Sequence, residues 1–243
     1  DYDEYPAKFA GKVIRASIGS IAIEESEKLP RADDARRQLL AGAPLRATLT
    51  GVEPTPARAL IMVISAGPVR DAAFWEQEGS SAIFRLPVRG TVAGLRTPSV
   101  RLDDAMPRSA RDTVVLRGSY ADGRYHLAAT RDGAVIQREL AASPSLLWAF
   151  LLPLPMYAFG GEVRVYTALW IGSIWLLLGY WASCSRDRTS TRSIAASAGA
   201  ALSLGLAAVP LAFDIPVAHS SEWLAAIVAF ALGWALARPP RAP

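Results

Sequence analysis

The sequence lacks asparagine altogether and contains a single cysteine, Cys184. Without asparagine there is no acceptor for N-linked glycans, and one cysteine cannot form an intrachain disulfide. Only three lysines stand against 23 arginines, a bias that indicates a GC-rich bacterial source. The chain begins with Asp1 rather than methionine, which predicts either a cleaved signal peptide or a truncated sequence.

Charge is scarce in the last hundred residues. Residues 143–243 contain six arginines and four acidic side chains, whereas residues 1–142 hold the other 20 basic and 18 acidic ones. A fall of this size predicts a change of solvent from water to a lipid bilayer. The basic side chains form no cluster with interleaved aromatic residues, so the net charge of +4 does not indicate nucleic-acid binding.

The clearest local pattern before residue 142 is a β-meander. Residues 113–120, 124–131 and 134–141 are three short runs rich in β-forming side chains. Between them lie Asp122-Gly123 and Asp132-Gly133, the dipeptides favoured in two-residue hairpin turns because both positions need positive φ. The spacing therefore predicts two consecutive hairpins.

Further strands are expected at 12–23, 45–52, 59–65 and 82–88, bounded by glycine and proline. Two helices are expected, at 33–40 and at 69–78. Strands at this spacing predict a β-sandwich or a small barrel. We therefore expect an α+β membrane protein, with a mainly-β, sandwich-like soluble domain at 1–142 and three or four transmembrane helices after it.

The soluble domain offers little catalytic chemistry. His126 is its only histidine. Alternation along the strand places His126 on a solvated face, and Tyr125 and Leu127 on the other face. Glu24, Glu25 and Glu27 lack the spacing of a calcium loop, so a solvated loop is the better interpretation. We expect no catalytic residue and no cofactor, and the domain suits binding or structural work better.

Three apolar stretches are predicted to span the membrane, at about 165–183, 193–213 and 222–237. In the second, small residues recur every four positions, a spacing that lets another helix pack closely. The third stretch has small residues at the same spacing. The predicted helix-packing residues are Ala195, Gly199, Ser203 and Ala207, and Ala225, Ala229, Gly233 and Ala237. Packing within the chain and packing against another molecule both remain open.

A fourth uncharged stretch, 140–161, carries Pro153 and Pro155 in its middle. These prolines break a helical ladder, so residues 143–161 are predicted to be interfacial, re-entrant or a kinked crossing. The segments 184–192 and after 237 carry arginines, whereas the segment 214–222 carries acidic residues. Because basic loops stay on the cytoplasmic side, the first two segments are predicted to lie in the cytoplasm. If 140–161 does not cross, the β-domain is extracytoplasmic; if it crosses, the domain is cytoplasmic. We favour three crossings in a bacterial inner membrane, with a periplasmic or extracellular N-terminal domain.

Asp214, His219 and Glu222 form the best polar cluster, in the predicted outer loop between the last two spans. Histidine and carboxylates are common metal ligands, although this spacing matches no ligand motif. The favoured hypothesis is a non-catalytic subunit of an envelope complex that contacts lipid and other membrane subunits, with no small-molecule ligand assigned. The alternative is a membrane enzyme or transporter component that uses the polar cluster.

Overall fold

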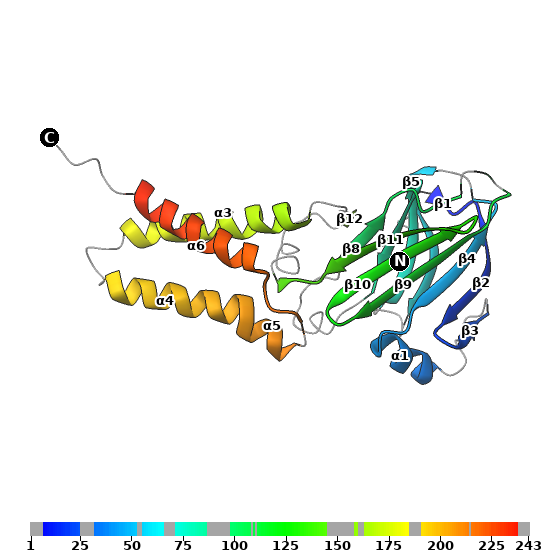
Figure 1. The fold of residues 1–243 in the computed structure, drawn as a ribbon, viewed down its shortest axis with the longest axis horizontal. Helices are drawn as coiled ribbons and strands as arrows, with labels where there is room; N and C mark the ends of the chain where they lie inside the picture. The colour runs from blue at the N-terminus through cyan, green and yellow to red at the C-terminus, as the bar shows by residue number, and fades with distance from the viewer. Residues whose placement is uncertain are drawn as a thin grey trace. The chain divides into compact units, whose positions relative to one another are not determined.

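The computed structural model describes residues 7–24, 32–52, 55–65, 71–86, 98–107, 109, 111–144, 158–159, 163–184, 191–213 and 215–237. They fall into two compact units. The β unit contains the described strands and the helix α1 (Ala32–Leu40), whereas the helical unit contains residues 142–144 and the helices from α3 onward (Figure 1). The predicted α+β class with a mainly-β N-terminal part is thereby confirmed.

Sheet A has six strands. Its order is β1 (Ala7–Lys8), β5 (Thr55–Ser65), β6 (Asp71–Gly79), β7 (Ser81–Arg85), β8 (Ser99–Leu102) and β12 (Ala158–Phe159). The strands from β5 to β8 pair antiparallel, whereas β1 and β12 join the two edges in parallel. β12 lies inside the range 143–161 that the sequence assigns to the membrane part, while Pro153 and Pro155 lie outside the described residues.

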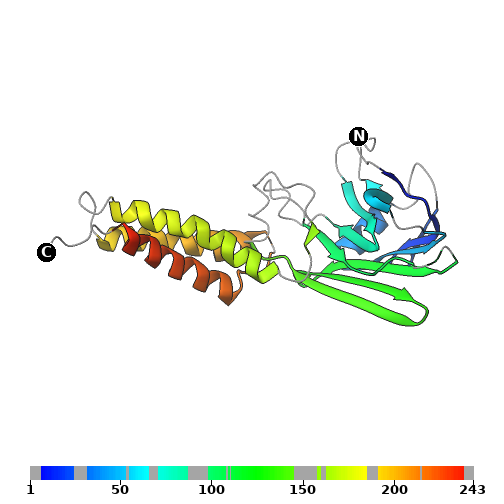
Figure 2. The same ribbon diagram turned by 90° about the horizontal axis from the view of Figure 1, so that it is seen from above.

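Sheet B has six antiparallel strands, and its best predicted part is the meander. Its order is β11 (Ala134–Ala141), β10 (Arg124–Arg131), β9 (Val114–Ala121), β4 (Leu45–Thr50), β2 (Lys12–Ile18) and β3 (Ile21–Ile23). Asp122 and Gly123 have φ of 50° and 73°, and Asp132 and Gly133 have φ of 51° and 78°. The two predicted hairpins are therefore confirmed, and the three strands lie side by side in Figure 2.

Two predicted elements of the β unit are wrong. The range 69–78 was expected to be helical, but residues 71–79 form the strand β6, between β5 and β7. Residues 73–77 are all buried, and a strand buried on both faces has no alternation to distinguish it from a helix. The single strand expected at 12–23 is instead the hairpin β2–β3, which turns at Gly19 with φ of 53°.

The two sheets pack face to face through a core of large side chains, an arrangement compatible with the expected sandwich. A Cβ added to Gly118 of β9 would lie 2.7 Å from the rings of Trp75 and Phe84 in sheet A, so only glycine fits there. The hydroxyl of Tyr125 donates a hydrogen bond of 2.8 Å to the carbonyl of Leu86. Burial of this ring raises the pKa of Tyr125 well above its usual value of 10.0.

Charged side chains form a network across sheet A and onto β11. The buried guanidinium of Arg58 lies 3.8 Å from Glu76 and 3.7 Å from Glu78. Arg101 then joins Glu78, at 2.9 Å, to Asp103, at 2.8 Å. Asp103 also receives a hydrogen bond from Arg138 of sheet B at 3.3 Å. The network therefore links β5, β6, β8 and β11 by ionic contacts, in addition to the apolar core.

Asp103 gives this network a pH dependence. Burial raises the pKa of Asp103, but hydrogen bonds from Arg101 and Ser81 and the nearby charges of Arg138 and Arg101 outweigh it and hold the pKa below 3.8. Because the folded pKa is lowered, the carboxylate stabilises the fold above pH 3.8 and loses this effect as the pH falls through the folded value. We expect Asp103→Asn to lower the melting temperature at neutral pH and to match the wild type in strong acid. A pH series of thermal unfolding curves checks this, and a difference that persists undiminished in strong acid would contradict it.

Helices occupy all three predicted spans. α3 (Val163–Cys184) covers the first; α4 (Thr191–Ser203), η4 (Leu204–Ala208) and α5 (Val209–Ala212) cover the second; α6 (Ser220–Leu236) covers the third. Two helical stretches among the described residues, Arg164–Cys184 and Arg192–Ala212, are long and apolar enough to cross a membrane. α6 is apolar but shorter, with 17 residues.

Candidate functional site

The helical unit is organised around a close contact between α3 and α6. A Cβ added to Gly233 of α6 would overlap the carbonyl oxygen of Leu176, and one added to Gly179 of α3 would overlap the carbonyl oxygen of Phe230. A Cβ on Gly172 would meet the Cβ of Ala229 at 3.7 Å. Gly172 lies against Ala229, whereas Leu176, later in α3, lies against Gly233, later in α6. The two helices therefore run parallel and lie side by side (Figure 2).

The predicted small-residue stripe of α6 lies on this contact. Ala229 and Gly233 are buried, and the carbonyl oxygen of Ala225 lies 3.9 Å from a Cβ built on Gly172. Ala237 is half-buried at the end of the helix. The glycines remove the side chains that would otherwise hold the two backbones apart, which is how membrane helices associate closely.

The predicted stripe of α4 lies differently. Ala195, Gly199 and Ser203 are exposed, and Ala207 of η4 is half-buried. A Cβ added to Gly199 meets no heavy atom within 4 Å among the described residues. α4 is held to the unit by another face, from which Leu202 packs into the core with Trp175. The small-residue face of α4 is therefore open, in contrast to that of α6.

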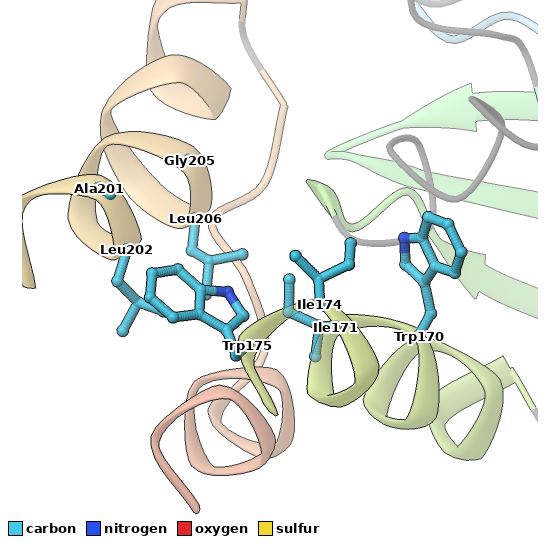
Figure 3. A pocket seen from close by; sticks show the side chains of 8 residues that line it. All are labelled: Trp170, Ile171, Ile174, Trp175, Ala201, Leu202, Gly205 and Leu206. Atoms are coloured by element: carbon cyan, nitrogen blue, oxygen red, sulfur yellow. The ribbon is translucent and has the colours of Figure 1, made fainter. Parts of the chain in front are cut away.

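An apolar cavity of about 190 Å³ lies between α3 and the junction of α4 with η4. In Figure 3 the indole rings of Trp170 and Trp175 lie on either side of Ile171 and Ile174. The facing wall consists of Ala201, Leu202, Gly205 and Leu206. With no charged lining residue, this space suits hydrocarbon rather than a polar substrate.

A proline explains why the second helical stretch widens into a π-turn. An α-helix would pair the carbonyl of Leu206 with the amide of residue 210, but Pro210 has no amide proton. The chain instead forms η4, in which the amide of Val209 bonds the carbonyl of Leu204. The amide of Ala218, from the following loop, donates to the freed carbonyl of Leu206 at 2.9 Å. The carbonyl group that the proline leaves without an amide partner is thus hydrogen-bonded within the helical unit.

Two members of the predicted polar cluster, His219 and Glu222, lie among the described residues, at the start of α6. Glu222 is 1% exposed, and its carboxylate accepts the backbone amide of His219 at 2.7 Å and the hydroxyl of Ser143 at 2.6 Å. His219 is the N-cap of α6, so Glu222 completes a capping box rather than facing solvent. Asp214 lies outside the described residues. Among the residues that the structure describes, no group of three His, Cys, Asp or Glu side chains is arranged to hold a metal ion.

Ser143 was not anticipated as a partner of Glu222. The two residues are 79 positions apart, and serine after a strand carries no signal for such a distant contact. His126, the other histidine, lies 3.2 Å from Glu139 on the neighbouring strand β11 and is 38% exposed. It forms an exposed cross-strand pair, an ordinary role for a polar strand residue.

The described residues thus define an α+β protein in which a two-sheet β unit accompanies a helical unit with two helices suited to a membrane. Comparison with known protein families, curated proteins and solved structures finds no match.

Proposed function

We propose that this chain is a non-catalytic, integral membrane subunit of a bacterial envelope complex. Its β unit lies outside the cytoplasm and serves as a protein-interaction or assembly module. The observation that carries the proposal is the open small-residue face of α4 around Gly199 and Ser203. The same chain buries Ala229 and Gly233 of an equivalent face where α6 meets α3. A helix of a neighbouring subunit is the natural occupant of the open face.

The surface of the helical unit supports a position in lipid. Large apolar side chains are exposed on each of its long helices, including Leu169 at 66%, Leu204 at 59% and Leu224 at 63%. Contiguous apolar surface of this kind is unfavourable in water and favourable in hydrocarbon. At about 1.5 Å per residue, the 17 residues of α6 reach roughly 25 Å, close to the roughly 30 Å of a bilayer core.

The parallel arrangement of α3 and α6 supports three crossings. Because α3 and α6 begin at the same end of the helical unit, the chain between them must return over the full length, and the stretch Arg192–Ala212 is long enough to do so. β11 and β12 both belong to the β unit, so the proposal keeps them on one side of the membrane, with α3 as the first crossing. The arginines between α3 and α4 then face the cytoplasm.

The alternative, a membrane enzyme or transporter component built on Asp214, His219 and Glu222, has less support. Both carboxylate oxygens of Glu222 accept hydrogen bonds that cap α6 and hold Ser143. A carboxylate engaged in this way is a poor candidate for a metal ligand or a proton carrier.

A photocrosslinking residue placed at Ser203 is expected to capture another membrane protein in membranes of the organism that makes this chain. The matched control is Leu177 of α3, which is 58% exposed and lies outside the small-residue stripes. We expect a protein adduct from position 203 and only lipid adducts from position 177, identified by mass spectrometry. Adducts with lipid alone at both positions, or with a second copy of this chain alone, would refute the hetero-complex.

A further inference from the structure

Three arginines surround a groove on the outer face of sheet B. Arg15 of β2, Arg46 of β4 and Arg117 of β9 point away from the core, because they alternate with buried residues such as Ala47 and Leu116. The strand register places Arg46 directly opposite Arg117, and Arg15 opposite Thr48, two residues further along β4. The groove measures about 220 Å³ and is lined by Arg15, Ala16, Ser17, Arg46, Thr48, Val115 and Arg117.

These arginines differ from those of the charged network on sheet A. Arg58, Arg101 and Arg138 each lie within ion-pair distance of a carboxylate. Within the described part of the chain, the three guanidinium groups of the groove have no such partner. Like charges placed directly opposite each other on neighbouring strands destabilise a sheet. An arginine pair such as Arg46 and Arg117 is therefore unfavourable for folding unless an anion offsets the repulsion.

The chemistry of the lining indicates which anion. A guanidinium group presents a planar fork of donors that matches the oxygens of phosphate, often in bidentate fashion. Ser17 lies opposite Arg46, and Thr48 opposite Arg15, so two hydroxyl donors stand between the arginines. Three guanidinium groups and two hydroxyls offer more hydrogen-bond donors than the two oxygens of one carboxylate can accept, whereas a phosphate group or a diphosphate can accept them.

We propose that this groove is a binding site for a phosphate-bearing ligand, gripped by Arg15, Arg46 and Arg117 with Ser17 and Thr48 as further donors. The phosphate belongs either to a soluble compound or to a lipid headgroup, two sources with the same chemistry at the groove. The groove is independent of the open face of α4, because every lining residue lies in the β unit.

The test is calorimetric titration of the full chain in a non-ionic detergent at low salt. The probes are inorganic pyrophosphate and monomeric dihexanoylphosphatidylglycerol. We expect at least one probe to bind, Arg46→Gln and Arg117→Gln each to weaken its affinity about tenfold, and the double variant to weaken it about 100-fold. The matched control is Arg124→Gln, which removes one exposed charge from β10 outside the groove and is expected to change affinity less than about twofold.

Each outcome of the titration either supports or overturns the phosphate site. Binding of pyrophosphate that depends on Arg46 and Arg117 supports a soluble ligand, and binding of the lipid alone supports a headgroup. Failure of both probes, or an equal loss in R124Q, would overturn the site. Thermal unfolding without ligand checks that the variants fold. R46Q and R117Q are expected to melt no lower than the wild type, because each removes a like-charge repulsion.

Discussion

Replacing Arg58 by methionine is expected to lower the free energy of unfolding of the β unit by about 3–5 kcal/mol. The Arg58 side chain is 5% exposed and that of Glu76 is 2% exposed, at a separation of 3.8 Å. Removal of the guanidinium takes the cation away from the buried Glu76 carboxylate, and the desolvation cost of that charge is then less well compensated. Denaturant unfolding of the full chain, followed by circular dichroism in the strand region, measures the loss.

The double variant R58M/E76M separates the cost of an unpaired buried charge from the contribution of the ion pair itself. It removes both charges and fills the space with apolar atoms, so we expect it to recover most of the stability that R58M loses. Glu78 remains paired with Arg101 at 2.9 Å, which leaves the rest of the network intact. A loss below about 1 kcal/mol in R58M, or no recovery in the double variant, would contradict a buried ionic contribution.

Gly233→Ala is expected to destabilise the helical unit by about 1–3 kcal/mol. The added methyl group would overlap the carbonyl oxygen of Leu176 and lie 2.9 Å from the amide nitrogen of Tyr180. Both are backbone atoms that no rotamer change can move aside, so α3 and α6 must separate. Thermal unfolding in detergent, followed by the helical circular dichroism signal, measures the effect.

Gly199→Ala is the matched control for that experiment. It makes the same chemical change in a neighbouring helix, where an added Cβ meets no atom of the described residues within 4 Å. We expect the melting temperature to stay the same or to rise slightly, since alanine favours the helix over glycine by up to about 1 kcal/mol. Equal losses in the two variants would show that glycine conformation, and not the α3–α6 contact, governs stability.

The parts of the fold that the sequence predicted correctly are those encoded locally. Asp122-Gly123 and Asp132-Gly133 need no distant partner to adopt positive φ, and they place the ends of β9, β10 and β11 within one or two residues. The helix at 33–40 is also confirmed, as α1, with Asp33 and Asp34 in its first turn and Gly42 shortly after its end. The three apolar stretches predict the positions of α3, of α4 with η4 and α5, and of α6.

The errors arise where tertiary packing decides. β6 was assigned as a helix because its buried run has no strand periodicity and ends at Gly79, a plausible helix stop. β8 and β12 have four and two residues, too few for any pattern. Their existence depends on neighbouring strands of sheet A, which a single sequence does not reveal.

The sites were harder to predict than the fold because their residues come from distant segments. Arg15, Arg46 and Arg117 meet only through the register of β2, β4 and β9. Glu222 was singled out for its chemistry, but its buried role depends on Ser143. In the helices, spacing identified the small residues, and only the packing distinguishes a closed stripe on α6 from an open one on α4.

The hydrogen bond from Ala218 to Leu206 has a mechanical consequence. It fixes Ala218, the residue before the N-cap of α6, to the middle of the second helical stretch. His219, the next residue along, caps α6 together with Glu222, which in turn holds Ser143. Leu206 of η4 is therefore linked by hydrogen bonds, through the residues that precede and cap α6, to Ser143, where the chain leaves β11.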